Sequence, residues 1–161
     1  MTGPDVASQE GAVYARYILS SLDRLMECIE GMEAAQWNWR PPAPETNSVY
    51  VLAVHTLGNA EENILGTVCG QPVMRDHARE FAARAESLDA LRRHWDELRG
   101  RLEAAMCGLS ADALGRAVRH PRRGTLTGRE VLIVVARHAA EHLGQAALTR
   151  DLAHAAHRRG E

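Results

Sequence analysis

Apolar residues recur every three or four positions along four stretches of the chain, which is the spacing of amphipathic helices. The stretches cover residues 9–32, 48–66, 87–109 and 127–156, and the second one can be extended to residue 70. The third stretch has the clearest pattern, which includes Trp95 among its leucines. The pattern predicts an all-α protein in which four long helices form a four-helix bundle.

Capping signals precede each of the four stretches. The residues suited to cap them are Ser8 for the first, Asn47 or Ser48 for the second, Ser87 for the third, and the capping box formed by Thr127 and Glu130 for the fourth. These signals support the helix starts that the apolar spacing predicts.

The interhelical connections are long and contain helix breakers. Residues 33–47 include three prolines, which forbid a helix, and we expect Trp37 and Trp39 to pack this loop against the core. In the second connection the sequence predicts only a short helical segment, at residues 76–84. The third, residues 110–126, contains the sequence HPRRGTLTG, which predicts a turn or a short hairpin.

Length and charge bound the class of protein. A chain of 161 residues is the size of one domain, so we assign residues 1–161 to a single unit with flexible tails at residues 1–8 and 157–161. The net charge of -2 removes the basic surface that a nucleic-acid-binding protein needs. All basic residues are arginines, which excludes Schiff-base, phosphate-loop and general-base chemistry that depends on lysine.

The cysteines and the N-terminal residues indicate a cellular compartment. Cys28, Cys69 and Cys107 are far apart and form no CxxC pair, so neither a disulfide framework nor a thiolate zinc site is indicated. No apolar run has the length of a secretory signal or a transmembrane helix. We therefore expect a cytoplasmic protein with no membrane partner.

Eight histidines are many for this length, and their positions separate them into groups. Five have polar or charged neighbours and are predicted to lie on the solvated surface: His77, His94, His120, His154 and His157. His138 and His142 differ, because a spacing of four places both imidazoles on the apolar face of the fourth helix, where they can bind one metal ion. The alternative is a pair of neutral histidines that are hydrogen-bonded in the interior.

A third histidine favours the metal interpretation. His55 lies in the apolar second helix, so three inward histidines from two helices match a divalent site with one open position. The segment from His138 to His142 also fits the H-x-x-E-H protease motif, but Glu141 projects away from the helix face that the two histidines share. A di-iron site would need two Glu-x-x-His motifs, which are absent, and heme has no specific support.

Two blocks of sequence resemble the DinB-like (DinB/YfiT) superfamily of small metal-binding helical proteins. WNWRPPAPETNSVYVLAVHTLG is similar to the family's Trp-Arg-Pro loop, Asn-Ser helix start and first histidine. RHAAEHLGQAALTRDL is similar to its H-x-x-x-H-x-G-Q helix. The resemblance implies an antiparallel four-helix bundle with a divalent ion, zinc or nickel, bound by His55, His138 and His142.

The resemblance also implies possible reactions and partners. Some members of the family activate a low-molecular-weight thiol such as mycothiol or bacillithiol for S-transfer, and members tend to form homodimers. A bound divalent ion lowers the pKa of a coordinated water or thiol, so it can prepare a nucleophile at neutral pH. The partners implied are a small-molecule substrate or thiol and a second copy of the chain, with no nucleic acid.

Three further residues are candidates for the catalytic machinery, and each has a plainer structural interpretation. Gln145 follows the histidines on the same face and can orient a ligand or bond to a ring nitrogen. Glu62 can act as a base, although a structural ion pair with an arginine is favoured. Arg40 can meet a substrate carboxylate, or it can anchor a packed loop.

Two functions of different classes follow from the sequence. The first is a metal-dependent enzyme that activates a small thiol or water for attack on an electrophile, as an S-transferase does. The second is a non-catalytic metalloprotein or ligand-binding stress protein in which the ion is structural. A cavity that reaches an open coordination position favours the first, and a fourth protein ligand favours the second.

Overall fold

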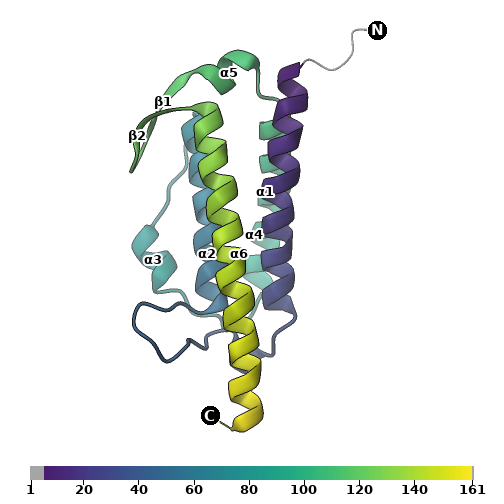
Figure 1. The fold of residues 1–161 in the computed structure, drawn as a ribbon, viewed down its shortest axis with the longest axis vertical. Helices are drawn as coiled ribbons and strands as arrows, with labels where there is room; N and C mark the ends of the chain where they lie inside the picture. The colour runs from purple at the N-terminus through teal and green to yellow at the C-terminus, as the bar shows by residue number, and fades with distance from the viewer. Residues whose placement is uncertain (1–5, 161) are drawn as a thin grey trace.

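Four long helices lie side by side in the computed structural model, which describes residues 6–160 (Figure 1). They are α1 (Val6–Glu30), α2 (Val49–Ala60), α4 (Asp89–Cys107) and α6 (Gly128–Arg159). A π-helical segment, η2 (Glu61–Val68), continues α2. The all-α class predicted from the apolar spacing is confirmed, with one small hairpin added.

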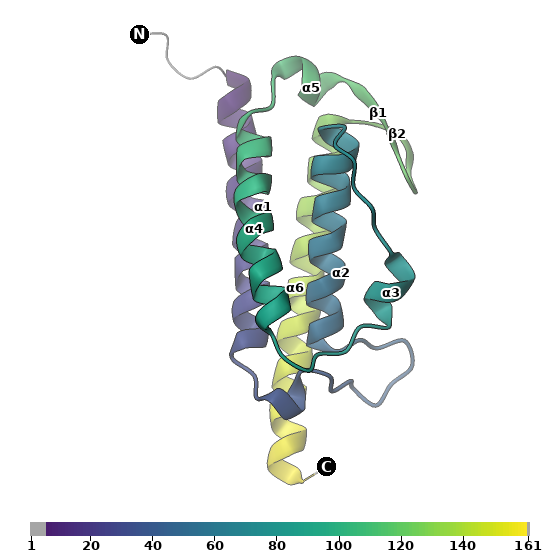
Figure 2. The ribbon, with the colours of Figure 1, turned by 180° about the vertical axis from the view of Figure 1, so that it is seen from behind.

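The long connection after η2 decides how the helices run. Figures 1 and 2 show α1 and α6 running in one direction, and α2 and α4 running in the other. The chain leaves the end of η2 and travels back along the outside before α4 begins (Figure 2). As a result α2 and α4 are parallel, although they are consecutive long helices.

Short elements occupy the connections. They are η1 (Ala34–Gln36), α3 (His77–Phe81), α5 (Ala111–Gly115), β1 (Ala117–His120) and β2 (Gly124–Thr127). The two strands form an antiparallel hairpin in which His120 pairs with Gly124, so the predicted hairpin is confirmed. Both α3 and the hairpin lie along the outer side of α2 and η2 (Figures 1 and 2).

The caps explain where the helices begin. Ser48 Oγ accepts a hydrogen bond from the Val51 N–H at 3.2 Å, and Thr127 forms the expected capping box with Glu130. Two of the predicted caps are wrong. Helix α1 begins at Val6, so Ser8 lies inside it, and Leu88 rather than Ser87 takes the cap position of α4.

Part of each predicted tail is helical where the structure describes it. Residues 6–8 belong to α1 and residues 157–159 belong to α6, because both helices extend beyond their apolar stripes. Residues 1–5 and 161 lie outside the described part of the chain. Basic side chains in the last turn of α6 favour this extension, since they complement the helix dipole.

The core is built from the stripes that the spacing identified. On α4 the buried residues are Leu91, Trp95, Leu98, Leu102 and Met106. Trp95 is therefore a core residue, as expected, and Trp37 and Trp39 pack partly buried against the same core. Full burial of one such apolar side chain contributes about 1.5–3 kcal/mol. None of the described helices has the length and apolar character that crossing a membrane requires.

Candidate metal centre

Three histidines from two helices meet beside the core. His55 comes from α2, and His138 and His142 come from successive turns of α6. The Nε2 atom of His138 lies 3.1 Å from the Nε2 atom of His55 and 3.1 Å from that of His142. The structure therefore brings together the three residues that the sequence analysis selected, with their Nε2 atoms directed at one another.

Hydrogen bonds on the far side of two rings determine where the imidazole protons lie. His142 Nδ1 lies 2.7 Å from Gln145 Oε1, an acceptor, so this nitrogen carries the proton. His55 Nδ1 lies 3.1 Å from the carboxylate oxygen Glu80 Oε2 and 3.2 Å from Arg75 Nη2. Because Arg75 Nη2 already donates to Glu80 at 2.8 Å, we place the His55 proton on Nδ1, where it donates to the carboxylate. In both residues Nε2 is then an unprotonated acceptor that faces His138.

The convergence of these lone pairs fits a cation. His138 has at most one N–H to offer, so it can satisfy only one of the two acceptors that face its Nε2 atom. A divalent ion accepts all three lone pairs at once. Ligand nitrogens at about 2.1 Å from a tetrahedral ion are separated by about 3.4 Å, close to the two observed separations.

His138 and His142 carry no positive charge at neutral pH. Burial, together with the neighbouring His142 and His55, lowers the pKa of His138 to about 3. Burial also lowers the pKa of His142, although the hydrogen bond to Gln145 opposes this effect. Both imidazoles are therefore neutral, which is the form that binds metal ions.

A buried carboxylate and a buried arginine support His55 from outside. Glu80, on α3, accepts hydrogen bonds from Arg75 Nε at 2.7 Å and from Arg75 Nη2 at 2.8 Å. Burial raises the pKa of Glu80, but hydrogen bonds from His55 and Arg75 outweigh it and the net pKa is lowered. Glu80 thus stays ionised and can orient the His55 ring, as carboxylates do behind metal-binding histidines.

Arg75 links this carboxylate to a second one. Its side chain is 4% exposed, and its Nη1 donates to Glu62 Oε2 at 2.8 Å. Glu62 also accepts from Arg122 Nη2 at 3.1 Å. The structural interpretation of Glu62, an arginine partner, is therefore the one that the contacts support.

A glycine makes room for the carboxylate. Gly58 lies one turn after His55 on α2, and a Cβ atom there would overlap Glu80 Oε1. A glycine in a helix interior weakens the helix by about 0.5–1 kcal/mol relative to alanine, so its presence here needs a reason. Close approach of Glu80 to the backbone of α2 supplies that reason.

The other two catalytic candidates have different positions. Gln145 is exposed and bonds only to His142 among the candidate residues, so it acts on the ring that it orients. Arg40 is exposed in the loop after η1, and its Nη2 donates to the Phe81 carbonyl at 3.4 Å. Arg40 therefore ties its loop to α3 and does not reach the three histidines.

The sequence analysis missed the contribution of two other histidines. His77 is exposed, as predicted, but its ring centre lies 5.3 Å from that of His55, and it forms a second group of potential ligands with His55 and Glu80. His120 was assigned to the surface and is 5% exposed, so that prediction is wrong. The hairpin turns His120 inward, which its polar neighbours in the sequence concealed. His94 and His157 are exposed as expected, and His154 is half-buried.

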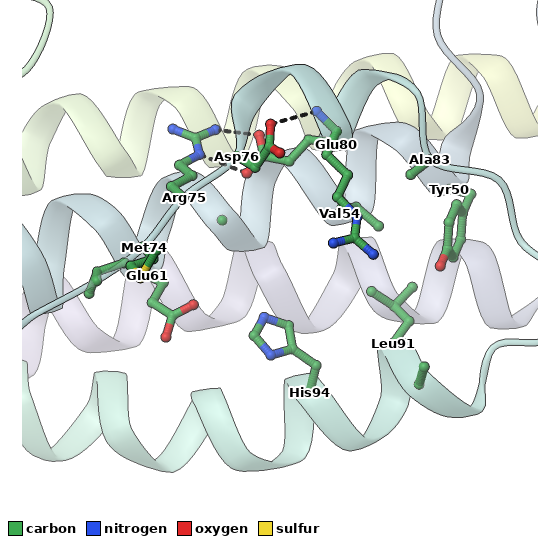
Figure 3. A pocket seen from close by; sticks show the side chains of 14 residues that line it. Tyr50, Val54, Glu61, Met74, Arg75, Asp76, Glu80, Ala83, Leu91 and His94 are labelled. Carbon is green, nitrogen blue, oxygen red and sulfur yellow. Dashed lines mark hydrogen bonds and ion pairs between the residues drawn. The ribbon is translucent and has the colours of Figure 1, made fainter.

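Two cavities adjoin this region. One has a volume of about 370 Å³ and is bordered by His55 and His138, so it opens on the three-histidine centre. The other, about 600 Å³, lies between α2, α4 and the segment that carries Arg75 and Glu80 (Figure 3). Only the smaller cavity is lined by residues of the centre itself.

These features define a helical protein with three histidines that can hold a metal ion. The group contains no fourth His, Cys, Asp or Glu among residues 6–160. The chain belongs to the DinB superfamily, whose family model matches residues 18–146. Among curated proteins, none matches this sequence.

A solved structure shares the fold. The crystal structure of a conserved protein from Enterococcus faecalis matches with a TM-score of 0.72 and 17% sequence identity. The match covers 88% of this chain and 95% of that one. At this identity the likeness concerns the fold alone.

Proposed function

We propose that the protein binds one divalent ion, zinc or nickel, through His55, His138 and His142, and uses it to activate a small thiol or water for attack on an electrophile. The observation that carries the proposal is the convergence of three Nε2 atoms, two of which are held as acceptors by Glu80 and Gln145. The arrangement of the long helices supports the finer expectation of a four-helix bundle of the DinB type.

The ion would supply one kind of chemistry, a lowered pKa for a thiol or water at its open position. The chain supplies the rest. Glu80 and Gln145 fix the orientation of two ligand rings, and burial keeps His138 neutral. His77 borders the same cavity, and burial lowers its pKa, so it is neutral at pH 7 and able to accept a proton from an entering nucleophile.

The cavity favours an enzyme over a structural metal site. Structural zinc sites are closed by a fourth protein ligand, whereas catalytic ones keep an open position. Here the cavity of about 370 Å³ borders His55 and His138 and is large enough for a small molecule. We place this proposed enzyme in the cytoplasm, because Cys28, Cys69 and Cys107 are not paired in disulfides in the structure.

The activity is tested with a thiol and a reactive acceptor. We expect the metal-loaded protein to conjugate bacillithiol or mycothiol to monochlorobimane faster than buffer, with the thiol sulfur displacing chloride as a new carbon–sulfur bond forms. The His142→Ala variant should lose this acceleration, and His94→Ala, a change at an exposed histidine, should retain it. Equal rates for protein, both variants and buffer, with both thiols and both metals, would contradict the enzymatic part of the proposal.

A further inference from the structure

The cavity beside the three-histidine centre has a second set of polar groups, contributed by the β-hairpin. Its lining includes His55 and His138 of the centre, Asn59 of α2, and His120, Arg122 and Arg123. His120, Arg122 and Arg123 come from the hairpin and its turn. None of these three belongs to the predicted metal-binding group, so they need a separate explanation.

His120 presents a buried donor without a partner. Its Nδ1 accepts a hydrogen bond from the Arg122 backbone N–H at 3.0 Å, so the ring proton is on Nε2. The residue is 5% exposed, and Nε2 has no hydrogen-bond partner among the described residues. Burial lowers the pKa of His120, which keeps the ring neutral. Buried donors are almost always paired in folded proteins, so this one points to a ligand acceptor in the cavity.

Positive charge accompanies this donor. The Arg122 guanidinium donates to Glu62, but that carboxylate is already paired with Arg75. Arg123 has no ion-pair partner among residues 6–160. A cavity lined by two arginines and a neutral N–H donor therefore suits a group that accepts several hydrogen bonds and carries negative charge.

An unpaired acceptor lies in the same cavity. The side chain of Asn59, on α2, is 7% exposed, and its Oδ1 atom has no hydrogen-bond partner in the described structure. This atom can accept a hydrogen bond from an O–H or N–H group. A ligand that matches both the hairpin side chains and Asn59 has an anionic acceptor group and a neighbouring hydrogen-bond donor.

We propose that Arg122, Arg123 and the Nε2–H of His120 bind the carboxylate of a small hydroxy acid or N-acylamino acid in this cavity, with its O–H or N–H group on Asn59. The inference deepens the proposed function, because it gives the chemical class of the molecule brought to the metal centre. The binding itself depends on the hairpin and does not require an ion.

The test is a titration of the full-length protein with lactate, N-acetylglycine and N-acetylcysteine, followed by nuclear magnetic resonance. The matched amides of the same three acids serve as uncharged probes. We expect saturable binding of the acids and at least tenfold weaker binding of the amides, because the charge-assisted hydrogen bonds are lost. The titration is run on the metal-loaded protein and after chelation, so that a failure of metal binding is distinguished from a failure of this subsite.

Substitutions in the hairpin test whether its side chains bind the acids. Arg123→Gln should weaken binding of the acids about tenfold in both metal states. Arg119→Gln is the matched control, since Arg119 is an exposed arginine on the same hairpin that does not line the cavity. His120→Phe removes the buried donor and should also weaken binding. If His120→Phe unfolds the protein, the affinity of Arg123→Gln for the acids decides the test. Absence of saturable binding of all three acids, or equal affinity of Arg123→Gln and Arg119→Gln, would overturn the inference.

Discussion

At the level of single residues, the arrangement of His55, His138 and His142 depends on hydrogen-bonding groups outside these three histidines. The acceptors facing His138 exist because Glu80 and Gln145 hold the protons of His55 and His142 on their Nδ1 atoms. Substitution of Glu80 or Gln145 should therefore change the affinity for the ion, although all three histidines remain.

Glu80→Gln is expected to weaken metal binding by about 10–100-fold, the usual effect of losing the carboxylate behind a metal-binding histidine. Competition with a chromophoric chelator measures this affinity. Glu61→Gln is the control, because Glu61 pairs with Arg101 at 3.1 Å and makes no contact with His55. A metal affinity of Glu80→Gln equal to that of Glu61→Gln would show that Glu80 does not position the histidine.

The three histidines and the residues that support them were not equally predictable. His138 and His142 were found because their spacing of four residues places them on one face of a helix. Glu80 and Arg75 lie in a connection with no regular period, and their positions depend on how that connection folds back onto α2. Gly58 gave a weak local signal, an interior helix glycine, whose meaning depends on Glu80 being opposite it.

At the level of secondary-structure elements, local sequence signals predicted where helices begin and where the chain turns better than they predicted which side chains are buried. The Thr127 capping box and the hairpin are local, and both were found. The hairpin places His120 inward and Arg119 outward, because successive strand residues face opposite sides. Which side meets η2 is decided by tertiary packing, so the burial of His120 was not visible in the sequence.

The path of the chain between helices also could not be predicted from local sequence signals. Residues 69–88 return the chain along the outside of α2, which makes α2 and α4 parallel (Figure 2). This connection contributes Arg75, His77 and Glu80 to the surroundings of His55. The region with the weakest periodicity therefore supplies most of the support for the site.

At the level of the whole molecule, α1 and α6 expose apolar side chains. They are Val13 and Tyr17 on α1, and Ile133, Leu148 and Leu152 on α6. The family resemblance implies a homodimer, and exposed apolar side chains of this kind are the ones that a second copy would cover.

We propose that the chain forms a homodimer that covers the exposed apolar side chains of α6. Light scattering coupled to size exclusion should give twice the chain mass of 17.7 kDa. Leu148→Glu should shift the mass toward a monomer, because a charge would be buried in the interface. Met74→Glu is the control, since Met74 is fully exposed on the connection before α3. A monomeric mass for the unmodified protein would contradict the proposal.

The central claim is that His55, His138 and His142 bind one divalent ion. Elemental analysis after loading with zinc or nickel and exhaustive dialysis measures the ion content directly, and about one ion per chain is expected from a single three-nitrogen site. His55→Ala, His138→Ala and His142→Ala should each lose most of that ion, while His94→Ala and His157→Ala, changes at exposed histidines, should retain it. An ion content that stays the same in all five variants would contradict the account.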